Sequence, residues 1–70
     1  MLTLIVKPTK HNKAVLEKRG LFSDDTPTFF RLYEKIMSDE IFMISFEYSL
    51  IDECRMNYLV DELNKIGIKF

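Results

Sequence analysis

The chain contains very little cysteine, histidine, glycine or proline. Its 70 residues include one cysteine, Cys54, and one histidine, His11. A single cysteine excludes an internal disulfide. One cysteine and one histidine are also too few ligands for a Cys/His zinc cluster. Two glycines and two prolines leave no low-complexity linker. We therefore expect one compact domain spanning residues 1–70, with no metal and no cofactor.

Long apolar runs are also missing. The longest is Ile41–Ile44, which is too short for a membrane span or for the core of a signal peptide. A lone thiol and no export signal fit a cytoplasmic protein, and we expect no membrane contact. A chain of this size buries only about 60% of its unfolded surface. Self-association is one of the few ways left to stabilise it, so we keep a homo-oligomer among the expected assemblies.

Charge is divided unevenly along the chain. Residues 1–20 hold five cations and one acid, a net charge of +4, whereas residues 21–70 hold five cations and ten acids, a net charge of −5. The total is only −1, with a pI of about 5.7. Such asymmetry affects what the surface attracts rather than the fold. If opposite charges lie on separate faces, they would steer association with another protein.

The hydrophobic pattern predicts three strands and three helices. The strands are expected at residues 2–6, 41–48 and 68–70, and the helices at residues 10–19, 27–37 and 50–66. Thr9, Thr26 and Ser49 stand at N-cap positions, and Asp52 is placed for a capping box with Ser49. The expected fold is α/β or α+β: a small three-stranded, mostly parallel or mixed sheet with three helices, in the order β-α-α-β-α-β.

Each helix carries an apolar stripe that we expect to be buried. The stripe of the second helix is Phe29, Leu32, Tyr33, Ile36 and Met37, and that of the last is Ile51, Cys54, Tyr58, Leu59, Leu63 and Ile66. In the first helix only a narrow stripe of Ala14 and Val15 is visible.

The two faces of the expected sheet differ in their partners. The face toward the helices should present Leu2, Leu4, Val6, Phe42, Ile44, Phe46, Tyr48, Ile68 and Phe70. The opposite face carries Ile5, Ile41 and Met43, which is too apolar for an ordinary solvated face. Either the first helix covers it or it is a protein interface. Phe30 and Met56, which lie off the main helical stripes, are further candidate interface residues.

A basic segment lies between the first strand and the first helix. Its candidate ligand-binding residues are Lys7, Thr9, Lys10, His11 and Lys13. A helix N-terminus offers free N–H groups and a positive dipole, so a phosphate or a nucleic-acid backbone could bind here. No glycine-rich phosphate signature accompanies it, and the low pI argues against nucleic acid. The alternative is an ordinary solvated surface.

Catalytic signatures are absent from the sequence. Cys54 could be a nucleophile with His11 as its base, but its place on an apolar stripe favours a core residue. We therefore expect a non-enzymatic protein-binding module that acts as a regulator or inhibitor through a surface. A small inhibitor encoded by a phage or mobile element would fit this size. Nucleic-acid or phosphate binding through residues 7–19, and thiol-dependent catalysis through Cys54, are the alternatives.

Overall fold

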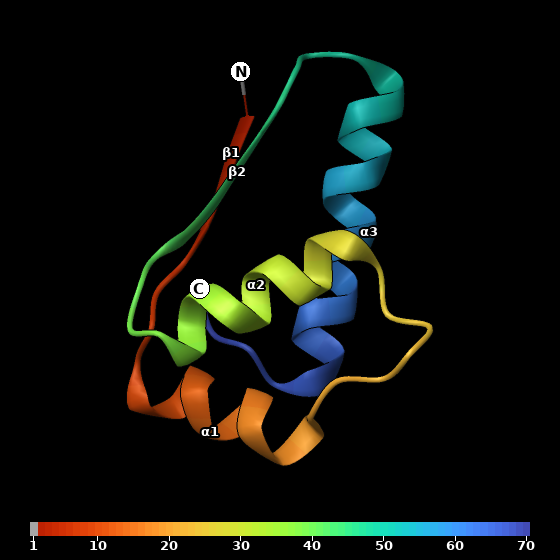
Figure 1. The fold of residues 1–70 in the computed structure, drawn as a ribbon. Coiled ribbons are helices and arrows are strands. Elements are labelled where there is room, and N and C mark those ends of the chain that lie inside the picture. Colours follow the sequence, from red (N-terminus) through yellow and green to blue (C-terminus); the bar gives the residue numbers. More distant parts are fainter. Residues whose placement is uncertain (1) are drawn as a thin grey trace.

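The computed structural model describes residues 2–70, which form three helices and one small sheet (Figure 1). In chain order the elements are β1 (Leu2–Val6), α1 (Lys10–Arg19), α2 (Pro27–Met37), β2 (Phe42–Phe46) and α3 (Leu50–Ile66). The three helices are confirmed at their predicted residues. The three-stranded, mostly parallel or mixed sheet is wrong, because the described residues form one sheet of two antiparallel strands. The fold is therefore α+β.

The direction of β2 follows from the two helices that precede it. The chain runs out along α1 and back along α2, so β2 starts at the end of the sheet where β1 finishes (Figure 1). The strands pair antiparallel, with Leu2 opposite Phe46 and Val6 opposite Phe42. A single crossover helix would have returned the chain to the other end of the sheet and favoured parallel pairing.

Residues 68–70, predicted as a third strand, form no strand. The side chain of Asn12 instead pairs with the backbone of Lys69: Nδ2 donates to the Lys69 carbonyl at 2.8 Å, and Oδ1 accepts from the Lys69 N–H at 2.8 Å. The same Nδ2 donates to the Lys7 carbonyl at 3.0 Å. Asn12 is fully buried, so one amide side chain satisfies backbone groups that a neighbouring strand would otherwise pair. Ile68 enters the core beside it.

The helix starts follow the local sequence chemistry. The hydroxyls of Thr9, Thr26 and Ser49 each accept a hydrogen bond from the backbone N–H three residues later, as predicted. The predicted capping box, in which the Asp52 carboxylate would accept from the Ser49 N–H, does not form. That carboxylate accepts from the Glu47 N–H at 3.0 Å, while the Ser49 N–H donates to the Glu47 carbonyl. Asp52 therefore ties the end of the β2–α3 connection to α3.

α2 and α3 end in the same backbone motif. Asp39 and Gly67 follow the two helices with φ values of 61° and 100°. In each case the next residue donates its N–H to the carbonyl five residues back. Glycine adopts this conformation without strain, whereas an aspartate does so at a cost. The end of α2 is therefore the more strained of the two.

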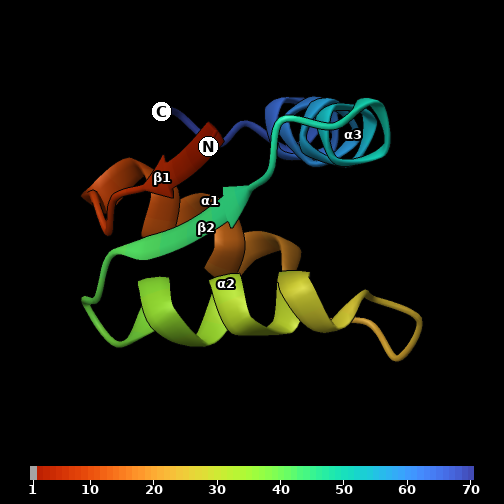
Figure 2. The ribbon, with the colours of Figure 1, turned by 90° about the horizontal axis from the view of Figure 1, so that it is seen from above.

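The core lies against one face of the sheet. It comprises Leu4, Val6, Leu16, Phe29, Leu32, Ile36, Phe42, Leu63 and Ile68. Figure 2 looks along α3 and shows α2 lying lengthwise beside the strands. On α1 the buried side chains are Asn12 and Leu16, so the predicted stripe of Ala14 and Val15 is wrong: Ala14 is exposed and Val15 only partly buried.

The other face of the sheet is uncovered. Ile5 and Met43 are 42% and 57% exposed, and Ile41 beside them is also exposed. The alternative in which the first helix covers this face is therefore wrong.

Candidate binding groove

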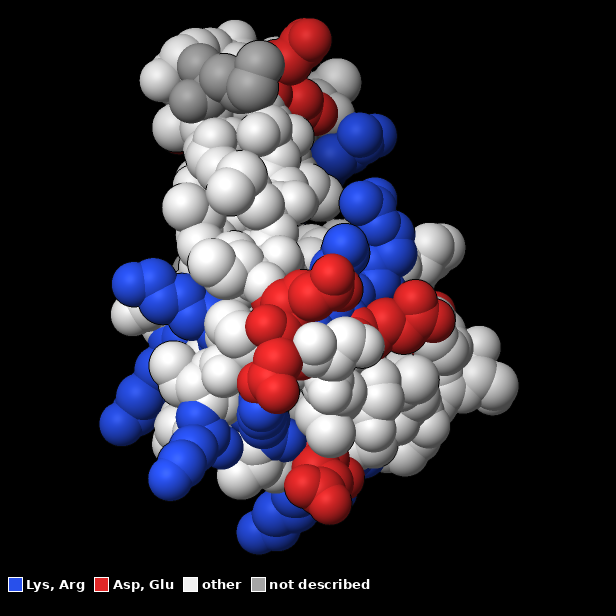
Figure 3. Space-filling model, turned by 60° about the vertical axis from the view of Figure 1, so that its left-hand side comes forward, with Lys and Arg blue, Asp and Glu red and all other residues white. Residues whose placement is uncertain are grey.

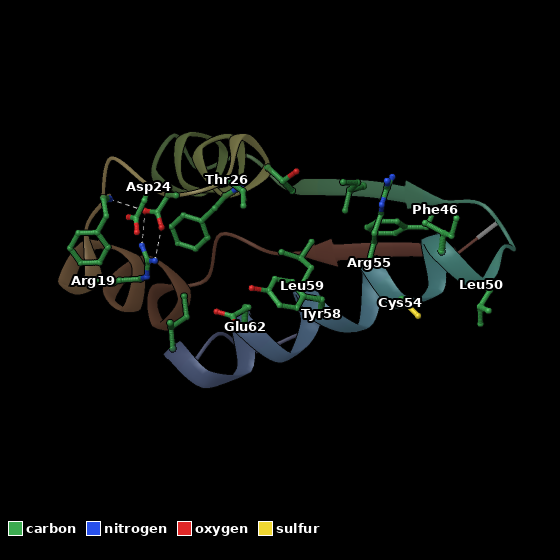
Figure 4. A pocket seen from close by; sticks show the side chains of 17 residues that line it. Arg19, Asp24, Thr26, Phe46, Leu50, Cys54, Arg55, Tyr58, Leu59 and Glu62 are labelled. Atoms are coloured by element: carbon green, nitrogen blue, oxygen red, sulfur yellow. Dashed lines mark hydrogen bonds and ion pairs between the residues drawn. The ribbon is translucent and has the colours of Figure 1, made fainter.

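A groove of about 1050 Å³ lies between β2 and α3. Ile44 and Phe46 of β2 form one wall, and Phe29 of α2 also lines the groove; Phe46 is labelled in Figure 4. The α3 wall comprises Leu50, Ile51, Cys54, Arg55, Tyr58, Leu59, Glu62 and Ile66. We call this feature the β2–α3 groove. Its lining is mainly apolar, so water in it makes few hydrogen bonds with the protein.

The groove exists because α3 is longer than the elements it packs against. Its 17 residues span about 25 Å, whereas the five residues of β2 span about 17 Å. Leu63 is the one fully buried residue of α3, so its core contact is near its C-terminal end. The N-terminal half runs on beside β2 without closing onto it (Figure 1).

This arrangement exposes side chains that were predicted to be buried. Ile51 and Tyr58 are each 67% exposed, and Cys54 is exposed. The prediction that Cys54 is a core residue is therefore wrong. Only the C-terminal part of the predicted stripe is covered: Leu59 and Ile66 are partly buried and Leu63 is fully buried.

The overall dimensions reflect the open groove. The chain exposes 5017 Å², whereas a compact monomer of 8.3 kDa exposes about 4600 Å². The radius of gyration is 11.8 Å, against about 11 Å for a compact chain of this length. The structure thus leaves several hundred Å² more surface in water than a closed fold would.

One end of the groove is closed by an ion pair between Arg19 and Asp25 (Figure 4). The guanidinium donates to both carboxylate oxygens, at 3.0 and 2.8 Å, and to the Gly20 carbonyl at 3.0 Å. It also stacks over the rings of Phe22 and Phe29, 4.9 and 4.1 Å from their centroids. The cluster therefore orders the α1–α2 connection that forms this end.

The pKa of Asp25 reflects this pairing. Hydrogen bonds from Arg19, and then one from the Phe22 N–H at 2.7 Å, lower the pKa of the carboxyl from 3.8 to about 2. Its hydrogen bonds to Asp25 in turn raise the pKa of Arg19. Nothing in the sequence pattern points to Arg19, because a side chain paired six residues away leaves no periodic signal.

Two charged side chains of α3 lie on the rim of the groove. Arg55 extends from α3 toward β2 in Figure 4, and its side chain is 71% exposed. Its partner is Asp52 on the same helix, at 3.7 Å. Glu62 lies 3.7 Å from Lys65, also on the same helix. Both contacts are long and exposed, so each charge is available to another molecule.

The basic segment is largely occupied by contacts within the chain. Thr9 caps α1, the Nε2 of His11 lies 2.7 Å from the Gly67 carbonyl, and Lys13 pairs with Asp39. Lys7 and Lys10 are exposed. Anion or nucleic-acid binding through this segment stays a prediction, and it now depends mainly on these two lysines.

Opposite charges do not separate cleanly onto different faces. The pairs Lys13–Asp39 and Arg19–Asp25 join the basic first twenty residues to the acidic remainder. On the face shown in Figure 3, cations and acids are interleaved beside a stretch with little charge.

The predicted interface residues fall into two groups. Ile5, Ile41 and Met43 lie together on the exposed sheet face, where Thr3 and Ser45 also form a hydrogen bond at 3.3 Å. Phe30 and Met56 are half-buried on α2 and α3 and do not line the β2–α3 groove. The role of both groups as an interface stays a prediction.

The structure does not bring Cys54 and His11 together. His11 contacts Gly67 at the C-terminal end of α3. Cys54 lies thirteen residues earlier on that helix, a distance of about 20 Å, and its thiol points away from the strands in Figure 4. No group of three metal-ligating side chains lies together among residues 2–70, and no helix described there is long and apolar enough to cross a bilayer.

Comparisons of the chain with protein-family models, curated proteins and solved structures found no match.

Proposed function

We propose that the chain is a non-enzymatic protein-binding module that receives an amphipathic helix of a protein partner in the β2–α3 groove. The observation that carries this proposal is the open apolar groove itself. Its two walls, Ile44 with Phe46 and Ile51 with Tyr58, belong to different elements and do not close onto each other. Exposed apolar patches of this kind are typical of interaction sites.

The dimensions of the groove suit a helix. One helical turn, taken as a cylinder 10 Å wide and 5.4 Å long, occupies about 420 Å³. The groove volume of about 1050 Å³ therefore corresponds to two to three turns. It lies at the upper limit for small-molecule pockets, which are also more enclosed. An amphipathic helix places apolar side chains at i, i+3, i+4 and i+7, and such a stripe would contact both walls.

The side chains present are of the kinds that contribute most at interfaces. The aromatic residues Tyr58 and Phe46 line the groove, as does Arg55. Tyrosine and arginine are enriched among the residues that contribute most of the binding energy at interfaces. Burying a side chain such as Ile51 stabilises a complex by about 1.5–3 kcal/mol. A protein that works in this way acts by occupying a partner, which is the basis for proposing a regulatory or inhibitory role. The single thiol supports a cytoplasmic setting as part of this proposal.

Photo-crosslinking tests this function. Replacing Tyr58 by p-benzoylphenylalanine places a reactive aromatic group of similar shape in the groove. The same replacement at Tyr48 is the matched control, since Tyr48 is 77% exposed and does not line the groove. Crosslinking is carried out in an extract of cells that express the chain, and the crosslinked segment is then synthesised.

We expect a discrete product from position 58 only. The synthetic segment should bind the unmodified chain and gain helicity, measured by circular dichroism. Equal products from positions 58 and 48 would overturn the proposal, as would a segment that binds without becoming helical.

A further inference from the structure

We propose that the helix received by the β2–α3 groove is α3 of a second copy of this chain, in a two-fold symmetric dimer with the two α3 helices antiparallel. This inference rests on the proposed function, because it names the partner of the same groove.

The groove side of α3 is a single helical face. Ile51, Arg55, Tyr58, Glu62 and Ile66 follow one another at steps of four, three, four and four residues, and all line the groove. Such spacing places them along one side of a helix. The face is therefore a continuous strip with apolar side chains at its centre and ends and one charge on each side of the centre.

This strip is complementary to itself when read in reverse. In an antiparallel pair centred between Tyr58 and Leu59, Arg55 lies opposite Glu62 of the other copy, and the reciprocal contact forms on the other side of the axis. Ile51 lies opposite Ile66 in the same register. A two-fold interface requires this property, because the same surface must serve on both copies. Two opposite-charge contacts would fix both register and direction.

The charges are free to make these contacts. Arg55 and Glu62 are 71% and 48% exposed in their side chains, and their present partners lie at 3.7 Å on the same helix. Exposed pairs of this kind contribute little to stability, so exchanging them costs little. The charges of the strip also balance between copies, since each strip contributes one cation, Arg55, and one acid, Glu62.

The dimensions of the chain support a second copy as the occupant. The exposed half of α3, residues 50–59, is nearly three turns long, so a second helix would cover apolar side chains that this chain leaves in water. Two-stranded sheets, and chains of about this size, are only marginally stable unless more apolar surface is buried. Part of the exposed apolar surface is on α3 itself, where Leu50, Ile51 and Tyr58 are 79%, 67% and 67% exposed. The exposed apolar side chains that the structure describes on the uncovered sheet face are Ile5, Ile41 and Met43, and none of them carries a charge.

A charge exchange tests the register. Solution mass is measured by sedimentation equilibrium over a range of concentrations, and the expected dimer has twice the 8.3 kDa mass of one chain. Arg55→Glu and Glu62→Arg should each raise the dimer dissociation constant by about tenfold or more. The double variant should return it to near the native value. Residues 55 and 62 are about 10 Å apart along one helix, so this rescue can arise only between copies.

Disulfide trapping provides a second readout that does not depend on charge. In a Cys54→Ser background, Tyr58→Cys puts a thiol beside the two-fold axis, and mild oxidation should link two copies. The native Cys54 is the control. In the proposed register it lies opposite Leu63 of the partner, and its own counterpart is nine residues away, about 13 Å along the helix. This is too far for a disulfide.

The outcomes separate this inference from the proposed function. If the chain is a monomer at every concentration and position 58 crosslinks to a different protein, the proposal that a second copy occupies the groove is overturned. The groove then stays a docking site for that other protein. A monomer with no product specific to position 58 would overturn both. A dimer that Met43→Glu dissociates and the α3 charge variants do not affect would place the interface on the exposed sheet face and overturn the inference.

Discussion

Replacing Asn12 by alanine should destabilise the chain far more than the same replacement of an exposed asparagine. Asn12 is fully buried and makes three hydrogen bonds to backbone groups of Lys7 and Lys69. It therefore joins the end of β1 to the C-terminal segment, residues that are otherwise far apart in the chain. Loss of this side chain releases both segments at once.

The size of the effect follows from those contacts. Each hydrogen bond contributes about 1 kcal/mol net, which gives about 3 kcal/mol for three. Lys7 and Lys69 are exposed residues, so water replaces part of what is lost and the larger penalty for buried unpaired groups does not apply. Alanine has a higher helix propensity than asparagine, which stabilises α1 by up to about 0.7 kcal/mol and offsets part of this loss. The expected loss is about 2–3 kcal/mol, against a total stability of about 3.5–10 kcal/mol for 70 residues.

Urea denaturation followed by circular dichroism measures this loss. The matched control is Asn57→Ala, since Asn57 is exposed on α3 and makes no side-chain hydrogen bond among the described residues. That variant should stay within about 0.5 kcal/mol of the native chain. If Asn12→Ala and Asn57→Ala lose equal stability, Asn12 does not hold the two segments together.

Three further predictions concern single side chains. Since the pKa of Asp25 is about 2 in the folded chain and 3.8 ordinarily, its stabilising contribution is complete well above pH 3.8 and is lost as the pH falls towards 2. Unfolding midpoints at several pH values should show this acid dependence, and Asp25→Asn should remove it; an identical profile in the variant would contradict the pairing. Asp39→Gly should raise the free energy of unfolding by up to about 1 kcal/mol, because it relieves positive-φ strain. Asp39→Ala loses the same ion pair and keeps the strain, so a glycine variant no more stable than the alanine variant would refute this account. Cys54 should react fully with a thiol reagent in the folded chain, and a thiol that reacts only after urea is added would show that α3 is packed differently.

The helices could be predicted because their signals are local. Thr9, Thr26 and Ser49 cap N–H groups three residues away, and Gly67 ends α3 through its own backbone conformation. The stripe of α2 reports burial correctly at Phe29, Leu32 and Ile36, which are in the core, but Met37 at its end is exposed. Each of these features depends on residues within about two helical turns.

The features that the sequence pattern missed depend on residues far apart. The direction of β2 is set by the path of two helices, and the C-terminal segment is held by Asn12, 57 residues before Lys69. A periodic stripe shows which side of a helix is apolar but not whether another element covers it. For this reason Tyr58 and Leu63 look alike in the sequence, although one is 67% exposed and the other fully buried.

Contacts at both ends of α3 fix its position beside the β2–α3 groove, and this affects what an occupant must supply. At the C-terminal end of α3, Leu63 is buried and the Gly67 carbonyl contacts His11. At the N-terminal end, the Asp52 carboxylate holds the Glu47 N–H at 3.0 Å and so limits how α3 turns away from β2. Binding to such a preformed groove requires little ordering of this chain, and the main entropic cost falls on the incoming side chains. A second α3 is already helical and held in the same way, so its ordering cost is also small. In the proposed dimer, a second copy would therefore lose less on binding than a segment that becomes helical only when bound.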